Sequence, residues 1–345
     1  DSINIRKNQF LTIFREFNFS DNSKYEDDSN SSSLMSLDFE MMSKFFFRSD
    51  LFERRRREEL ASMFMTLQSE AEEERFRLFL ELLIKQSSPS KNNVTDNFIL
   101  KALKLIEIYS RSEEFHEEDE IHKECRKDLI NEALVRIGFV ELACELMAWT
   151  QSEPIINRIL RIMNSILKNG NKKAQTAFLL NSKKYNSALI FGNFSRILSA
   201  NFEKISKKVL DRNTQEIRKI LYGEITMTKS DDLELDRAIE ACILQFRFLQ
   251  LLCEGLNRDS QNFLRDQNNK RENHDMISKS VLMFGAFIKF FNKKSYLLGL
   301  RILGFLIDSL QGPCRENQSV AIKCKLLDFA NDFVNELSCS EEEMR

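Results

Sequence analysis

The sequence predicts an all-α protein, and three observations support this fold class. Only 9 Gly and 3 Pro occur in 345 residues, so few residues are present that would interrupt a helix. Apolar residues recur at steps of three and four along much of the chain, the spacing that places them on one face of an α-helix. No run alternates apolar and polar residues over the length that would predict a half-buried strand.

The clearest helix is expected just before residue 170. Its apolar positions are Ile155, Ile156, Ile159, Leu160, Met163, Ile166 and Leu167. Arg158 and Arg161 fall on other faces, as in an amphipathic helix. Pro154 falls in the first turn and Gly170 just past the end, which matches the residues that start and stop helices.

The same pattern predicts further helices in order along the chain. They cover about 95–110, 126–148, 172–180, 187–210, 213–222, 232–254, 259–267, 272–292, 295–310 and 318–337. Asn213 and Glu216 have the spacing of a capping pair at a helix start. Successive helices joined by short polar turns predict an armadillo-like α-solenoid of stacked helix pairs, whose repeat period is too irregular to count.

The first part of the chain, 1–125, is expected to be a helical segment with two interruptions. A disordered loop is predicted near 19–33, which is rich in Ser, Asn and Asp, and a linker near 86–93. The Glu-rich stretch 112–124 is interpreted as another exposed connection.

Composition excludes several classes of function. The 51 basic and 53 acidic residues nearly cancel, so nucleic acid is not an expected partner. No apolar run reaches the roughly 20 residues of a membrane-spanning helix. The 7 Cys show no metal-binding or disulfide spacing and indicate a reduced, cytosolic protein. The chain lacks an initiator Met, so we expect it to be a piece of a larger protein.

Two clusters outside the main pattern have simpler explanations than a site. The basic run 54–57 could be a nuclear signal or a phosphate-binding patch, but acidic neighbours flank it, which favours a solvated helix face. His116 and His122 lie among carboxylates without tetrahedral ligand spacing, which favours a solvated loop over a metal site. No nucleophile–base order, Gly-rich phosphate loop or HExxH occurs, so we do not expect an enzyme.

Two strings near the end carry a specific resemblance. Residues 246–270 read FRFLQLLCEGLNRDSQNFLRDQNNK, and residues 311–318 read QGPCRENQ. They resemble the RIH-associated homology region of the inositol 1,4,5-trisphosphate receptor and ryanodine receptor calcium-release channels. The NRDxQNFLRxQNNK and GPCxENQ forms are closer to the trisphosphate receptor, and the LCEG step is closer to the ryanodine receptor.

This resemblance implies a regulatory Ca²⁺ site. In the family, the Glu after LLC and the Glu three residues before QGPC belong to a cytosolic activating site, which a backbone carbonyl from the C-terminal part of the channel completes. The matching positions here are Glu254 and Asp308, the second being one methylene shorter in an altered context, IDSLQGPC. Each acid also falls at the end of a predicted helix, where a carboxylate meets the negative end of the helix dipole and a bound cation would relieve that repulsion.

The resemblance extends upstream and implies a division of the chain. Residues 168–179 resemble the family's GGNxxxQxxFF turn, in which we interpret Asn171, Gln175 and Phe178 as structural. Residues 126–230 are then RIH-like armadillo helices, and 231–338 an RIH-associated-like helical domain. The implied partners are other domains of the same channel, as a homotetramer, at the cytosolic face of the endoplasmic reticulum or a related calcium store.

Two hypotheses for function follow. The first is a cytosolic regulatory segment of an intracellular ligand-gated calcium-release channel, contributing part of a Ca²⁺-sensing site and coupling it to the pore. The second is a soluble armadillo-like scaffold that binds protein partners without channel activity. A cluster of membrane spans with a selectivity filter after residue 345 would favour the first, and a stop codon soon after it the second.

Overall fold

The computed structural model describes residues 77, 80, 93–111, 120–222, 229–268, 272–289, 291 and 295–343. Every regular element within these residues is a helix and none is a strand, which confirms the all-α prediction. The predicted loop near 19–33, the basic run 54–57, most of the predicted linker and the side chains of both candidate histidines lie outside the described residues.

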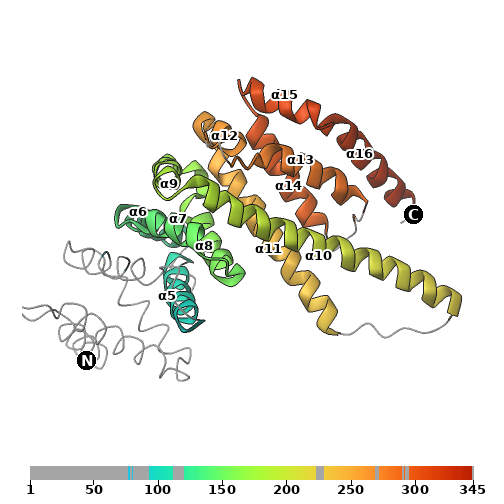
Figure 1. Ribbon diagram of the computed structural model, residues 1–345, viewed down its shortest axis with the longest axis horizontal. Helices are drawn as coiled ribbons and strands as arrows, with labels where there is room; N and C mark the ends of the chain where they lie inside the picture. The colour runs from blue at the N-terminus through green and yellow to red at the C-terminus, as the bar shows by residue number, and fades with distance from the viewer. Residues whose placement is uncertain are drawn as a thin grey trace, which may run out of the picture.

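The described helices follow one another along the chain (Figure 1). In chain order they are α5 (Asn93–Arg111), α6 (Glu120–Arg136), α7 (Phe139–Trp149), α8 (Glu153–Ile166), the 3-10 turn η1 (Lys168–Gly170), α9 (Lys172–Lys184), α10 (Ser187–Tyr222), α11 (Lys229–Cys253), α12 (Arg258–Arg265), α13 (Met276–Ile288), α14 (Tyr296–Leu310), α15 (Arg315–Lys323) and α16 (Leu326–Glu343).

Helices three places apart in the chain pack against each other and form three rows. One row is α5, α8, α11 and α14, a second is α7, α10, α13 and α16, and the third is α6, α9, α12 and α15. Each unit of the stack therefore contains three helices and buries its apolar faces against the next unit. This stacking makes α11 and α14 neighbours, although two helices separate them in sequence.

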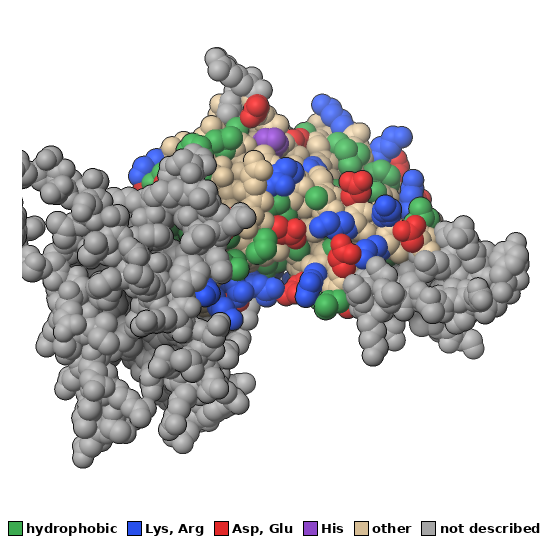
Figure 2. All heavy atoms as spheres, turned by 60° about the horizontal axis from the view of Figure 1, so that its bottom comes forward, with side chains coloured by type: hydrophobic (Ala, Val, Ile, Leu, Met, Phe, Trp, Pro, Cys, Tyr) green, Lys and Arg blue, Asp and Glu red, His purple; other side chains and the backbone are tan. Residues whose placement is uncertain are grey.

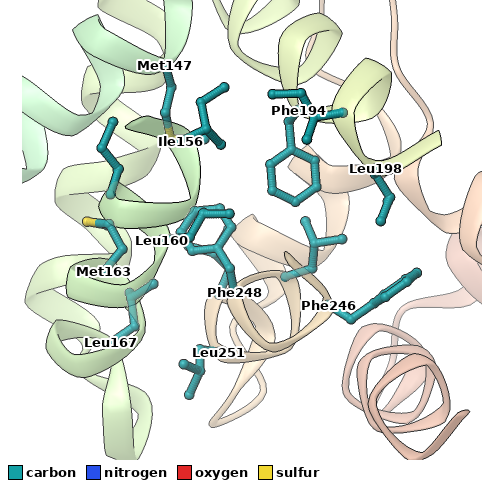
Figure 3. Packing of buried hydrophobic residues seen from close by; sticks show 14 of the residues in the cluster. Met147, Ile156, Leu160, Met163, Leu167, Phe194, Leu198, Phe246, Phe248 and Leu251 are labelled. Carbon is teal, nitrogen blue, oxygen red and sulfur yellow. The ribbon is translucent and has the colours of Figure 1, made fainter. Parts of the chain in front are cut away.

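The core is continuous where four helices of successive units meet. Met147 of α7, Leu160 of α8, Phe194 of α10 and Phe248 of α11 point toward a common centre (Figure 3). The Phe178 ring of α9 meets the Phe248 ring edge to face, with centroids 5.2 Å apart. Side chains this fully buried each contribute roughly 1.5–3 kcal/mol relative to exposure, so the units are held together mainly by apolar contact.

Local chemistry explains where several helices begin. Pro154 lies in the first turn of α8, as predicted. The Asn171 side chain accepts a hydrogen bond from the backbone N–H of Ala174 and caps α9. The α13 helix begins later than predicted, because Asp275 accepts hydrogen bonds from the N–H groups of Ile277 and Ser278 and acts as the N-cap.

Two predicted helices are each divided in the structure. The segment predicted as 126–148 is interrupted at Gly138, whose φ of 95° is readily adopted only by glycine and ends α6. The segment predicted as 318–337 is interrupted at Lys325, which adopts φ 65° between α15 and α16. A positive φ at a residue other than glycine is not visible in the apolar pattern, so this second break was not predicted.

Two other predictions placed a break or a connection where the structure has helix. The helices predicted as 187–210 and 213–222 are one helix, α10, so Asn213 and Glu216 do not cap a new helix. No Pro or Gly follows Gly192 within α10, and nothing in the backbone stops the helix at Asn213. The connection predicted for 112–124 ends earlier, because α6 begins at Glu120.

Basic and acidic side chains are interspersed on the described part of the face shown in Figure 2, which therefore carries no large patch of one charge. This pattern agrees with the near-neutral composition. Among the described helices, none combines the length and apolar character needed to cross a membrane.

Candidate functional site

Helices α11 and α14 lie side by side and run in the same direction. The rings of Phe246 and Phe305 are 6.4 Å apart between centroids. Further along both helices, the Gln250 amide donates to Asp308, and beyond the helix ends Leu256 approaches Gly312. Because contact partners advance together along both chains, the two helices are parallel and end at the same edge of the stack.

Both predicted acids are at this edge. Glu254 directly follows Cys253, the last residue of α11, and Asp308 lies in the last turn of α14. Gly255 and Gly312 follow them with φ of 77° and 80°, so the backbone turns away after each acid through a conformation that glycine adopts without strain. The structure thus brings together the two helix ends that the sequence indicated.

A chain of hydrogen bonds joins α11 to α14 through Arg247, Gln250 and Asp308. Arg247 Nη1 donates to Gln250 Oε1 at 2.9 Å, and Gln250 Nε2 donates to Asp308 Oδ2 at 2.9 Å. Gly304 leaves room for this amide, because a Cβ there would lie 3.1 Å from Gln250 Nε2. One oxygen of Asp308 is therefore oriented by Gln250, which is oriented by Arg247.

The electrostatics of the site depend on two guanidinium groups. Burial lowers the pKa of Arg247, and nearby Arg301 lowers it further, whereas Glu254 and Asp308 act in the opposite direction. Arg247 is thus close enough to interact with both acids and with Arg301. Two cations against two carboxylates leave little net negative charge, so this cluster alone attracts a divalent cation weakly.

Glu254 has a buried oxygen that lacks a protein partner. Its Oε2 is fully shielded from solvent and accepts no hydrogen bond. The Arg301 Nε of α14 is likewise buried, and it donates no hydrogen bond. A buried carboxylate oxygen without a donor is costly, and a bound cation or a donor from another part of the protein would remove that cost.

Ca²⁺ fits these residues only as an incomplete set. It takes six to eight oxygen ligands, and carboxylates are among its preferred ones. Glu254 and Asp308 provide carboxylates, with Glu254 Oε2 unoccupied by any donor. Among the described residues, however, no group of three or more His, Cys, Asp or Glu side chains could hold a metal ion. The remaining ligands would have to come from outside this set.

Sequence reasoning missed the residues that surround the acids. Arg247 and Gln250 lie on one face of α11, and Glu254 continues that face just past the last residue of the helix. Arg301, Gly304 and Asp308 lie on one face of α14. Each residue of the first set is separated from its counterpart in the second set by the same number of positions. That constant spacing could have indicated two parallel helices in register.

The residues interpreted as structural are structural. Asn171 caps α9, Gln175 is fully buried, and Phe178 belongs to the core. Several phenylalanines of the C-terminal half also belong to the core: Phe263, Phe284 and Phe287 are buried, and Phe291 is half-buried.

The segment that contains both acids is similar to a known protein family. Residues 237–334 match the family described as RyR and IP3R Homology associated. The matched segment begins within α11 and ends within α16, so it contains the parallel helices α11 and α14.

Proposed function

Through residues 237–334 the chain belongs to the RyR and IP3R Homology associated family, the family of ryanodine and inositol trisphosphate receptor channels, and on this premise we propose that it is a channel regulatory segment. The channel is an intracellular ligand-gated calcium-release channel closer to the trisphosphate receptor, and the segment lies on the cytosolic face of the endoplasmic reticulum or a related store. The family consists of channels, and no catalytic role is part of the proposal.

The observation that carries the proposal is the parallel packing of α11 and α14, which brings Glu254 and Asp308 to one edge. We propose that these carboxylates are half of a regulatory Ca²⁺ site, completed by oxygens from another part of the full-length protein. When bound, Ca²⁺ would supply the positive charge that holds the two parts together. The buried, unpartnered Oε2 of Glu254 supports this role.

The surrounding side chains suit a site that is weak until completed. Arg247 and Arg301 offset the charge of the acids, and Gln250 already occupies one oxygen of Asp308. The segment alone should therefore bind Ca²⁺ poorly. In the intact channel, binding would favour the conformation that brings the two parts together, and the shift is limited by the difference in affinity between conformations.

We also propose a wider organisation of the chain, in which residues 126–230 are RIH-like armadillo helices and residues 231–338 are an RIH-associated-like domain. Its partners are other domains of the same channel, in a homotetramer. A Ca²⁺-dependent movement at the acids would then reach the pore through contacts between these domains.

The test uses the full-length channel with Glu254→Gln and Asp308→Asn, separately and together. Single-channel recording over a range of cytosolic Ca²⁺ measures the concentration for half-maximal opening. We expect half-maximal opening of the double variant to need at least roughly tenfold more Ca²⁺. A tenfold change in concentration corresponds to about 1.4 kcal/mol. Asp259→Asn is the matched control, because Asp259 is an exposed acid in the first turn of the neighbouring helix α12.

An unchanged Ca²⁺ dependence in a folded double variant would refute the half-site. A full-length protein that conducts no ions under any condition would instead support the soluble scaffold hypothesis, since a scaffold binds partners without a pore.

A further inference from the structure

A buried glutamine holds the backbone at each of the two acid-bearing helix ends. Gln175, near the start of α9, donates through Nε2 to the carbonyl oxygens of Leu251 and Glu254, each at 2.9 Å. Gln261, near the start of α12, donates through Nε2 to the carbonyl oxygens of Asp308 and Gln311, at 2.8 and 3.0 Å. Both glutamine side chains are almost completely buried.

These contacts satisfy carbonyls that a helix leaves without partners. The last four carbonyls of a helix have no N–H within the helix, and when they are buried each needs another donor. A side-chain amide has two N–H groups, and each glutamine places both on one helix end. Because one of the two contacted carbonyls at each helix end belongs to the acid itself, Glu254 or Asp308, the amides fix the main chain from which each carboxylate extends.

Neighbouring hydrogen bonds set the orientation of the Gln175 amide. Asn257 Oδ1 accepts from the backbone N–H of Ser260, which leaves Asn257 Nδ2 to donate to Gln175 Oε1 at 2.7 Å. A reversed Gln175 amide would place its oxygen against two carbonyl oxygens and lose this bond. The donor end of Gln175 is therefore directed at α11. Gly170 lies beside the same carbonyl, because a Cβ at Gly170 would be 3.5 Å from the Glu254 carbonyl oxygen.

Gln261 also connects the two acids to each other. It belongs to α12, whose N-cap Asn257 lies three positions after Glu254, and it reaches across to the carbonyl of Asp308. Asn317 strengthens this link, because its Nδ2 donates to the carbonyls of Gln261 and Ser309, at 3.0 Å each. Glu254 is thus connected to Asp308 by the backbone that leads into α12 and by the hydrogen bond from Gln261.

We propose that Gln261 and Gln175 are positioning residues of the Ca²⁺ half-site, an inference that rests on the proposed function. Gln261 sets the separation of the two carboxylates, and Gln175 sets their place relative to the preceding helix unit. Neither amide contacts the cation. The backbone carbonyl oxygens of Glu254 and Asp308 already accept hydrogen bonds from these amides. The carboxylates are therefore the groups that remain to bind a cation.

The test replaces each glutamine with Met in the full-length protein. Methionine keeps the length and flexibility of the side chain but has no N–H donor. Gln245→Met is the matched control, because Gln245 is a fully buried glutamine of α11 whose amide donates to the Phe194 carbonyl, away from the acids. Gln261→Glu is a second variant of nearly the same shape, for use if the Met variant does not fold.

Two readouts separate positioning from general stability. Hydrogen exchange measured by mass spectrometry without added Ca²⁺ should become faster at 305–313 in Gln261→Met and at 249–257 in Gln175→Met, and at neither in Gln245→Met. Single-channel recording should show half-maximal opening at roughly tenfold higher Ca²⁺ in both positioning variants, the usual loss when a group that orients a metal ligand is removed.

A double-mutant cycle gives the decisive result. If Gln261 acts through the carboxylates, Gln261→Met should cause little further loss once Glu254→Gln and Asp308→Asn are present, because coupled residues are not additive. An unchanged Ca²⁺ dependence in folded Gln261→Met and Gln175→Met, while the acid variants shift it, overturns the positioning role and leaves the proposed function intact. Unchanged dependence in the acid variants as well overturns the proposed function, and the positioning role with it.

Discussion

Gly299→Ala should destabilise the protein, because the added methyl group has no space. A Cβ at Gly299 in α14 would lie 2.7 Å from Cε1 and 3.0 Å from Cζ of Phe287 in α13. Phe287 is fully buried, and its ring packs edge to face on Phe291 with centroids 5.8 Å apart. The ring therefore cannot rotate into solvent, and α13 and α14 must separate.

The size of the effect follows from two opposing contributions. Carbon atoms pack best at about 3.5–4 Å, so the contact must open by roughly 1 Å. Forcing an extra methyl into a packed core costs about 1–3 kcal/mol. Alanine recovers up to about 1 kcal/mol of helix propensity relative to glycine. The expected net loss is about 1–2 kcal/mol of unfolding free energy.

Urea unfolding followed by far-ultraviolet circular dichroism measures this loss, provided that the slope of free energy against urea is unchanged. Gly192→Ala in α10 is the matched control, because its Cβ would face only the end of the half-buried His274 side chain, with Nε2 at 3.2 Å. It should be neutral or slightly stabilising. A midpoint for Gly299→Ala that equals or exceeds that of Gly192→Ala would show that the α13–α14 contact is not tight.

Two further predictions concern buried ionisable groups. Burial raises the pKa of Glu145 in α7, where Oε2 lacks a partner, so the charged form destabilises the fold at pH 7 and stability is recovered as pH falls through the raised pKa. Glu145→Gln should therefore increase the urea midpoint at pH 7. The gain should disappear below about pH 4, where glutamate is protonated even in the unfolded chain. A lower midpoint at pH 7 would contradict this prediction. Burial also raises the pKa of the Cys144 thiol to about 12, and it raises the pKa of the Cys253 thiol. In the native protein, a thiol reagent at pH 8 should therefore label the half-buried Cys324 well before Cys144 or Cys253. Peptide mass spectrometry follows the labelling of each cysteine. Labelling of Cys144 as fast as Cys324 would show that α7 opens readily.

Much of the fold could be predicted because its evidence is local. The apolar spacing of α8 or α14 depends on residues within one helix. Pro154 marks the start of α8 through its own backbone preference, and Gly170 ends the turn η1 that follows α8. The placement of Glu254 and Asp308 at helix ends is local in the same sense. The missed breaks and the missed continuity of α10 arose where backbone conformation does not follow the apolar pattern, as at Lys325.

The sequence by itself determined most of the helical residues, which faces are apolar, and that two acids each stand at a helix end before a glycine. Only the tertiary structure decided that the stack repeats every three helices, because the lengths of its members differ widely, from the 8 residues of α12 to the 36 of α10, and hide any period. It also decided that α11 and α14 are parallel neighbours, with Arg247 and Gln250 beside Asp308 and buried Gln175 and Gln261 on the helix ends. The physical reason is that helix formation depends on neighbours within a few positions, whereas the partner of a helix end is chosen by packing between segments far apart in the chain.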